Sequence, residues 1–558
     1  MSYRASAASQ EPRWMWAAAG VIACAGACVL IYFGRQARPL WVDEEMLALN
    51  ARDRSFRELA GGLLLGQAAP LGWLALERAS MLTLGLSERA VRALPVFWGL
   101  LTLITAVWVG RRWLGPVGAA ILALLCSVGN DVWFFALELK HYSADTFGGL
   151  LMPSLAAWAM EAPADQPRRT IRRADVWWIA AGLMQWFSYG ALFVTPACGF
   201  VILWLIWRRA GARVAWRAAV MSLFWIAGAA LHYYLGIRSA SNSAYLREYW
   251  MAAFPPVSGG ASETLRWVAG AIAGLAKSPG GTSYALLFWI VAIAGLVISG
   301  RERSALGIMN TTVMPSALLL ALLRMVPLSG RLSLWIVPSL YVGIATAGDT
   351  AVRELVSAVQ TRRWLIAAVA LAFFAPAAVL CADIYRTGEF DIKTRPAGSA
   401  HSLDDRTAIR SLMTHRHPGD AMLTTHLGLP AVWWYGNVNL SDSKEGASFA
   451  DGGPIFEIWA AAPGPACAPD DLRSALADVN GVTLYLGFEV PDHLEALALN
   501  RLAELGAVTV YRRFVQSSHT AVIDLRQPPT GKILLPGLQS DPSLRPEGCV
   551  TIKRAHRW

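Results

Sequence analysis

Residues 14–34 read WMWAAAGVIACAGACVLIYFG, and residues 41–45 read WVDEE. The first segment is an apolar run long enough to cross the hydrocarbon core of a bilayer. It is too long and too rich in tryptophan for a signal peptide, and no A-x-A cleavage site follows it. We therefore predict an uncleaved membrane anchor, followed within a few residues by three consecutive carboxylates, Asp43, Glu44 and Glu45.

The rest of the chain repeats the apolar character of this first run. Hydrophobic residues make up 55% of the 558 residues and charged residues 16%, whereas a soluble globular protein carries about 25% charged residues. This composition excludes an ordinary soluble enzyme, a disordered chain, a collagen and a disulfide-rich mini-protein. With the first run, we count about 11 transmembrane helices of a polytopic α-helical membrane protein. The further runs lie near 92–110, 115–136, 144–160, 176–188, 191–207, 216–235, 283–300, 305–323, 332–348 and 364–382.

The stretch 176–207 decides the number of spans. Ser188, Tyr189 and Gly190 stand in its middle, so we read it as two short spans joined by a tight turn. With that reading, the short loops that are dense in arginine all fall on one side, as the positive-inside rule requires of the cytoplasm. The N-terminus is then cytoplasmic and residues 383–558 are extracytoplasmic. A single span over 176–207 would reverse every later loop.

This topology divides the chain into a transmembrane domain at 1–382 and a C-terminal extracytoplasmic α/β domain at 383–558. The first outer loop is 35–91 and the second long outer loop is 236–282. Both have apolar residues at helical spacing, including Phe56, Leu59, Leu63 and Leu64, which predicts short amphipathic helices on the outer face. In the tail we expect helices near 404–415 and 493–505, and strands at 421–424, 482–486 and 508–511.

Charge and cysteine usage constrain the partners. The net charge is +10, and it belongs to the transmembrane domain, because the tail carries more acidic than basic residues. Loop arginines explain this balance, and since no Lys/Arg-rich block of the nucleic-acid type is present, we expect no nucleic-acid partner. Cys467 and Cys549 in the tail are suited to pair if the tail faces an oxidising compartment. The sequence leaves that pairing open.

Two further clusters interrupt the apolar pattern. Residues 138–145 read ELKHYSAD between two spans. There Lys140 is suited to contact a phosphate and Glu138 to pair with Lys140, although a structural salt bridge at a helix hairpin is the alternative. Arg324 and Arg331 bracket MVPLSG in a short outer loop. A guanidinium at that position suits bidentate phosphate recognition, and a snorkelling arginine is the alternative. For the acidic triplet, the alternative to chemistry is a solvated loop start.

Taken together, these segments resemble the multi-span C-type glycosyltransferases, such as protein O-mannosyltransferases and bacterial lipid A aminoarabinose transferases. The acidic residues directly after the first span are the first point of likeness. The others are QAAPL (67–71), ERAVRALP (88–95), ELKHYSAD (138–145) and SGRL (329–332) with Pro338. The chain departs from the family at Ala68 and Ala69, where His or Pro is frequent, which leaves the acceptor contacts open.

The resemblance implies an inverting transfer of a hexosyl or pentosyl unit on the outer face of the membrane. The donor would be a polyprenyl-phosphate-linked sugar, and the acceptor a lipid, a glycan or a protein. Asp43 would be the general base, and Glu44 would assist it, with a divalent Mg or Mn ion on Asp43 and Glu44 as an open alternative. Lys140 and Arg331 would neutralise the phosphate leaving group. Supporting positions are Glu45, Gln67, Glu138, His141, Tyr142 and Arg324.

Two other classes stay in view. A membrane transporter or lipid flippase would use intramembrane carboxylates for ion coupling, but such proteins often show inverted repeats, and the sequence shows none. A non-catalytic membrane scaffold for the outer domain would not need Asp43, Lys140 and Arg331. The excess of Arg over Lys and the overall plan indicate a bacterial inner membrane and a role in the cell envelope.

Overall fold

The computed structural model describes residues 13–36, 38–162, 165–256, 260–301 and 304–360, a few positions between 375 and 383, and then 404–438, 446–461, 471–488, 494–504, 508–515, 518–525 and 549–555. The chain divides into two compact units. We call the first the membrane unit, Met1–Ala37 with Phe56–Phe390, and the second the C-terminal unit, Arg38–Ser55 with Asp391–Trp558. Residues 38–55 of the predicted first loop thus belong with the tail.

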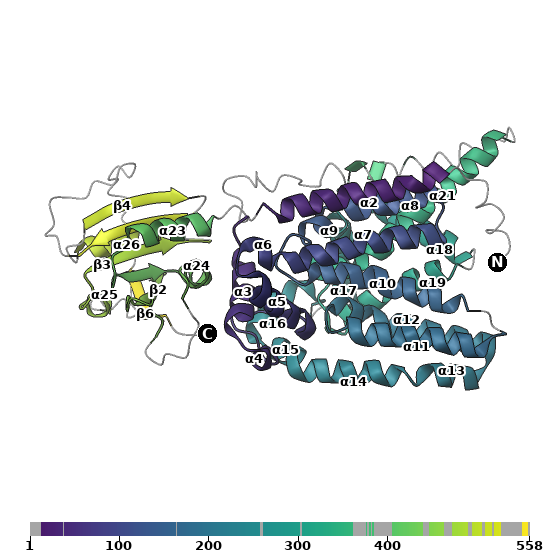
Figure 1. The fold of residues 1–558 in the computed structure, drawn as a ribbon, viewed down its shortest axis with the longest axis horizontal. Helices are drawn as coiled ribbons and strands as arrows, with labels where there is room; N and C mark the ends of the chain where they lie inside the picture. Colours follow the sequence, from purple (N-terminus) through teal and green to yellow (C-terminus); the bar gives the residue numbers. More distant parts are fainter. Residues whose placement is uncertain are drawn as a thin grey trace. The chain divides into compact units, whose positions relative to one another are not determined.

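Long helices lying side by side make up most of the membrane unit (Figure 1). They are α2 (Arg13–Gly34), α7 (Ala93–Trp113), α8 (Pro116–Val128), α10 (Tyr142–Met160), α11 (Pro167–Met184), α12 (Tyr189–Ala210), α13 (Ala212–Ala219), α14 (Ser222–His232), α17 (Ala261–Lys277), α18 (Ala285–Arg301), α19 (Ala305–Thr311), α20 (Val313–Leu322) and α21 (Val337–Gln360). The helices α2, α7 and α8 pack against one another, as do α10 and α12, and α18 and α21.

Among the described residues, six helices are long and apolar enough to cross a membrane when consecutive elements are joined. They are Trp16–Gly34, Glu88–Trp113, Tyr189–Ala210, Ala212–Asn242, Ala305–Leu322 and Gly330–Ala358. Pro116–Val128 and Ala285–Arg301 are apolar but shorter. The number of eleven spans stays a prediction, and most of the predicted span 364–382 lies outside the described residues.

The stretch 176–207 breaks where the sequence predicts a turn. Helix α11 ends at Met184 and α12 begins at Tyr189. Ser188 caps α12, because its hydroxyl accepts a hydrogen bond from the backbone N–H of Ala191 at 2.9 Å. The structure differs at the other end, since α11 starts at Pro167 and not near 176. The arginines between the predicted spans 144–160 and 176–188 therefore lie in the first two turns of α11 and not in a loop.

Short helices from the two outer loops gather at one end of the bundle (Figure 1). They are α4 (Phe56–Leu59), α5 (Leu71–Leu84), α6 (Glu88–Val91), α15 (Arg238–Asn242), α16 (Ala244–Tyr249) and η2 (Met251–Ala253). The expected helix over Phe56–Leu64 ends early, at Leu59. Helix α14 continues through η1 (Tyr233–Ile237) into α15, so helical structure extends past the predicted loop start at 236.

The C-terminal unit contains a mixed six-stranded sheet with the order β4-β5-β3-β1-β2-β6. Its strands are β1 (Ala421–Thr424), β2 (Ile455–Ala461), β3 (Gly481–Leu486), β4 (Val508–Val515), β5 (Ser518–Asp524) and β6 (Cys549–Arg554). The central strand β1 is parallel to β2 and β3, and the outer pairs are antiparallel. The helices are α23 (Asp405–His415), α24 (Leu429–Tyr435), α25 (Asp471–Ala475) and α26 (Leu494–Glu504).

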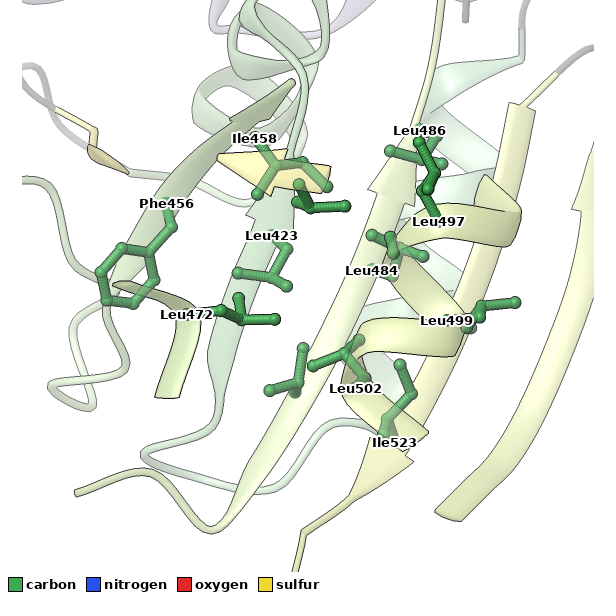
Figure 2. Close-up of a cluster of buried hydrophobic side chains, with 14 of the residues drawn as sticks. Leu423, Phe456, Ile458, Leu472, Leu484, Leu486, Leu497, Leu499, Leu502 and Ile523 are labelled. Atoms are coloured by element: carbon green, nitrogen blue, oxygen red, sulfur yellow. The ribbon is translucent and has the colours of Figure 1, made fainter. Parts of the chain in front are cut away.

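A leucine-rich core joins this sheet to its helices. Every residue of β3 is buried, and the leucines of α26, including Leu497 and Leu502, belong to one cluster with Leu484 (Figure 2). Trp433 and Trp434 of α24 are also buried. The expected helices and the strands β1, β3 and β4 are confirmed, whereas β2, β5 and β6 were not predicted. Cys549 is disulfide-bonded, and Cys467 lies outside the described residues.

The helix that carries the acidic triplet, α3 (Val42–Asp53), is part of the C-terminal unit. It packs against α24. The backbone N–H of Leu40, just before the helix, donates to the Tyr435 hydroxyl at 2.8 Å, and the Trp41 ring meets the Phe488 ring edge-on at 4.9 Å. The structure therefore groups the acidic triplet with the sheet domain, although the triplet follows the anchor α2 by only a few residues in the chain.

Candidate functional site

The predicted donor-binding residues lie together in the membrane unit. The segment ELKHYSAD passes from α9 (Asn130–Phe134) through a tight turn into α10, and all eight of its side chains are buried. Lys140 Nζ donates to Gln67 Oε1 at 2.6 Å. The Gln67 amide in turn donates to the Leu65 carbonyl at 3.2 Å, within a turn where Leu65 and Gly66 both have positive φ. The first outer loop thus supplies Lys140 with its hydrogen-bond acceptor.

Arg331 reaches the same place from a distant part of the sequence. It lies in the short helix η3 (Gly330–Ile336), and its guanidinium carbon is 5.9 Å from the centre of the Tyr142 ring and 5.8 Å from that of Trp250. Burial, followed by the positive charges of Lys140 and Arg331, lowers the pKa of His141 to about 3. His141 is therefore neutral at pH 7. The charges that act on it come from its neighbour in the chain, Lys140, and from the distant Arg331.

We call Gln67, Lys140, His141, Tyr142 and Arg331 the cationic cluster. Aromatic rings line it. The His141 ring lies 4.8 Å from Tyr142 and 5.1 Å from Tyr189, measured between ring centroids. Nδ1 of His141 is buried and has no hydrogen-bond partner among the described residues. Lys140 and His141 are buried and Arg331 is partly exposed, and a cluster with two cations and a neutral imidazole suits an anionic group better than a cation.

Two other predicted positions have structural surroundings. Arg324 is exposed, its guanidinium donates to the Pro255 carbonyl, and it lies over the Phe254 ring, so it braces the second outer loop. Glu138 is buried, and its carbonyl accepts a hydrogen bond from the Lys140 N–H at 2.7 Å. The ELKHYSAD turn also holds Asp145, whose Oδ1 accepts from Ser188 Oγ and Gly190 N–H, each at 2.9 Å. Asp145 therefore fixes the break between α11 and α12.

The three carboxylates of the acidic triplet have three different environments in the C-terminal unit. Glu44 is fully buried, accepts from the Trp41 N–H at 2.9 Å to cap α3, and lies 3.5 Å from the Arg38 guanidinium. Glu45 is also fully buried. Asp43 is the partly exposed member. Of the three, Asp43 is the one that retains solvent-exposed surface.

Glu45 belongs to a buried group that the sequence did not reveal. Burial, followed by the negative charges of Asp405 and Glu44, raises the pKa of Glu45 well above its usual range. Burial raises the pKa of Asp405 to about 7, although the hydroxyl of Tyr485 donates to it at 2.5 Å. Asp405 and Tyr485 come from α23 and β3. The one local signal for this buried group in the sequence is the second glutamate, Glu45, directly after Glu44.

The environment of Glu44 bears on the alternative of a divalent ion. Its Oε2 already accepts a backbone hydrogen bond and lies beside a guanidinium. In the portion of the chain that the structure describes, no three side chains of His, Cys, Asp or Glu form a group that would hold a metal. The divalent ion on Asp43 and Glu44 stays a prediction, and no step below uses a metal.

No family model matches the sequence, and no curated protein matches it significantly. Solved structures match the fold. The crystal structure of ArnT from Cupriavidus metallidurans bound to undecaprenyl phosphate has a TM-score of 0.50 at 14% identity, over 90% of this chain and 97% of that chain.

Two further structures match more distantly. The oligosaccharyltransferase of Archaeoglobus fulgidus has a TM-score of 0.40 at 10% identity, over 90% of this chain and 72% of that chain. The arabinofuranosyltransferase AftD from mycobacteria has a TM-score of 0.41 at 13% identity, over 92% of this chain and 40% of that chain.

ArnT is of the class that the sequence resembles. The likeness to ArnT is a likeness of fold, since identity is low. The chain is a multi-pass, mostly helical membrane protein with a small sheet domain, and the predicted resemblance is confirmed at this level.

Proposed function

We propose that this protein is an inverting membrane glycosyltransferase that uses a polyprenyl-phosphate-linked sugar as its donor. The observation that carries the proposal is the cationic cluster. Lys140 and Arg331 come from different ends of the membrane unit's sequence, yet both charges act on the same buried histidine. A pair of neighbouring cations, one buried and one partly exposed, suits a phosphate, and a likeness in fold to ArnT, whose structure holds undecaprenyl phosphate, supports a lipid-linked phosphate as the ligand.

The proposed reaction is a single displacement. The Asp43 carboxylate takes the proton from an acceptor hydroxyl, and the hydroxyl oxygen attacks the anomeric carbon of the donor sugar. The bond from that carbon to the phosphate oxygen breaks, and the electron pair leaves with polyprenyl phosphate. Lys140 and Arg331 stabilise the negative charge that develops on the leaving phosphate, the kind of interaction that is usually the largest catalytic contribution. One displacement inverts the anomeric configuration.

Glu44 and Glu45 are given no part in proton transfer. Glu44 is engaged as the cap of α3, and Glu45 is buried. We assign the base role to Asp43 because it is partly exposed. We place the reaction on the extracytoplasmic face of a bacterial inner membrane, since the arginine-rich loops favour a cytoplasmic N-terminus and the disulfide of Cys549 supports an oxidising compartment for the tail.

The test uses purified full-length protein in phospholipid vesicles. It is given a panel of polyprenyl-phosphate hexoses and pentoses, with lipid, glycan and peptide acceptors. The expected result is a glycosylated acceptor with inverted anomeric configuration and release of one polyprenyl phosphate for each sugar transferred. A flippase would move the sugar lipid between leaflets and form no glycosidic bond, and a scaffold would do neither. Either of those results across the panel would overturn the proposal.

A further inference from the structure

Asp43 and Arg52 lie near opposite ends and on opposite sides of helix α3. With about 3.6 residues per turn, Glu45 and Arg52 are seven positions apart and lie almost on the same line of the helix. Asp43 precedes Glu45 by two positions and Arg52 by nine, which places it on the opposite side of the helix from both. Residues 44–51 between them are all buried, whereas Asp43 and Arg52 are partly exposed.

Arg52 binds the C-terminal end of α3 to the end of α24. Its guanidinium donates to the Trp433 carbonyl at 3.1 Å and to the Val438 carbonyl at 2.6 Å. These carbonyls come from the C-terminal part of α24 and the residues just after it, where carbonyl groups lack intrahelical partners. The same guanidinium pairs with Asp53 and lies 5.4 Å from the centre of the Trp434 ring. A planar fork with five donors is suited to such a multiple contact, whereas an ammonium is not.

The start of α3 is held by the same unit. The Leu40 N–H is bonded to the Tyr435 hydroxyl, and the Trp41 ring packs on Phe488. In the first turn, Glu45 interacts electrostatically with Asp405 of α23 and Tyr485 of β3. Its acidic neighbour on the same helix is Glu44. Both ends of α3 are therefore fixed to elements of the sheet domain, and the face between them is covered.

We infer that Arg52 is a positioning residue, which holds the C-terminal end of α3 against the end of α24 so that the C-terminal unit sets the orientation of Asp43 in the first turn of the same helix. The role rests on the proposed function, in which Asp43 is the base. It gives the sheet domain a part in catalysis beyond that of an appended module. Since the contacts of Arg52 are with Asp53, α24 and Val438, its loss should change the rate of the chemical step and leave donor binding as it is.

The experiment compares three variants of the full-length protein. R52Q removes the two bonds to the α24 carbonyls, R52K keeps the charge without the fork, and R57Q changes an exposed arginine of α4 as the matched control. We expect R52Q to lower kcat about tenfold or more, the effect of a small displacement of a catalytic group, with the donor KM within about twofold. R52K should recover part of the loss, and R57Q should match the wild type.

Hydrogen exchange separates this inference from the proposed function. The amide protons of residues 42–53 should exchange faster in R52Q than in the wild type, while those of β3 stay protected and show that the sheet is folded. If α3 keeps its protection in R52Q, or if R52Q raises the donor KM and spares kcat, Arg52 is not a positioning residue. If the wild type transfers no sugar but α3 responds as expected, the proposed function is wrong and the anchoring of α3 stands.

Discussion

The two compact units concentrate opposite charges. The membrane unit holds the buried Lys140 and the partly exposed Arg331 near a neutral histidine, and the C-terminal unit buries Glu44, Glu45 and Asp405 near a tyrosine. In both, ionisable groups lie where hydration is poor, which is costly unless it serves binding or stability. In the cationic cluster, the excess charge suits a ligand of opposite sign. In the acidic group, the raised pKa of Glu45 and of Asp405 favours their neutral forms. Of the acidic triplet, Asp43 alone is partly exposed.

The contrast teaches that a run of similar residues need not share one role. Three adjacent carboxylates appear equivalent in sequence, yet one caps a helix, one is buried beside Asp405 and one is partly exposed. The lysine and arginine of the cationic cluster appear unrelated in sequence, yet their charges act on the same side chain. Position on the folded chain, and not spacing along it, decides which groups are available for chemistry.

The sharpest way to break this comparison is to neutralise each carboxylate of the triplet in turn. D43N should lower kcat by at least about 100-fold, the usual contribution of a general base, with donor binding unchanged. E263Q, at an exposed acid of α17, is the control and should behave as the wild type. Steady-state kinetics with the polyprenyl-phosphate sugar measure the effect. Unchanged turnover in D43N would remove Asp43 from the mechanism.

The cationic cluster should respond in a different parameter. K140Q and R331Q each remove one positive charge that would face the donor phosphate, and we expect the Kd for undecaprenyl phosphate to rise about tenfold, the value of one charge-assisted hydrogen bond. R247Q, at an exposed arginine of α16, should leave it unchanged. Titration of the full-length protein in detergent micelles with undecaprenyl phosphate measures this. Equal affinity in all four proteins would mean that the cluster is structural.

The sequence predicted the fold class because its signals are local. An apolar run of about 20 residues or a pair of strand-forming residues is visible within one window. The break at Ser188 could be predicted because polar residues stand in the middle of an overlong run. The strands β2, β5 and β6 were missed: β6 pairs with β2 although nearly ninety residues separate the two strands, and no local pattern marks such a distant pairing.

The candidate site was predicted only in part, because some of its residues are marked by local patterns and others depend on distant contacts. Gln67, Lys140, His141, Tyr142 and Arg331 were chosen as unusual polar residues between apolar spans and through the family resemblance, and the structure brings them together. The sequence did not indicate that α3 folds with the tail, because that depends on Arg52 meeting the end of α24 about 380 positions later. Nor did it distinguish Glu44 from Glu45, whose surroundings come from α23 and β3.

Asp145 offers a stability test of the membrane unit. It accepts two hydrogen bonds that fix the break between α11 and α12, and a typical intramolecular hydrogen bond contributes about 0.5–1.5 kcal/mol. D145A should therefore lower the thermal midpoint of the full-length protein by several degrees, whereas D145N keeps an acceptor and should lower it less. T83A, on α5, serves as the control. A midpoint for D145A equal to that of the wild type would show that Ser188 alone maintains the turn.

The smallest expected effect concerns the acidic group and depends on pH. Asp405 has a pKa of about 7 in the folded unit, above its usual value near 4. A carboxyl whose pKa is raised by folding contributes stability below pH 4, and this contribution is lost as the pH rises towards 7. Asp451, whose bond to Arg416 lowers its pKa to about 2, acts in the opposite sense below pH 4 and does not interfere in this window.

The amide protons of β3 should thus be better protected at pH 5 than at pH 8, once exchange is corrected for its intrinsic pH dependence. D405N keeps an oxygen that can accept from Tyr485 but cannot ionise, so its protection should change less between the two pH values. D478N, at an exposed acid near the end of α25, should follow the wild type. If D405N shows the full pH dependence, ionisation of Asp405 does not limit the stability of the C-terminal unit, and the contrast between the buried acids and the buried cations loses its energetic basis.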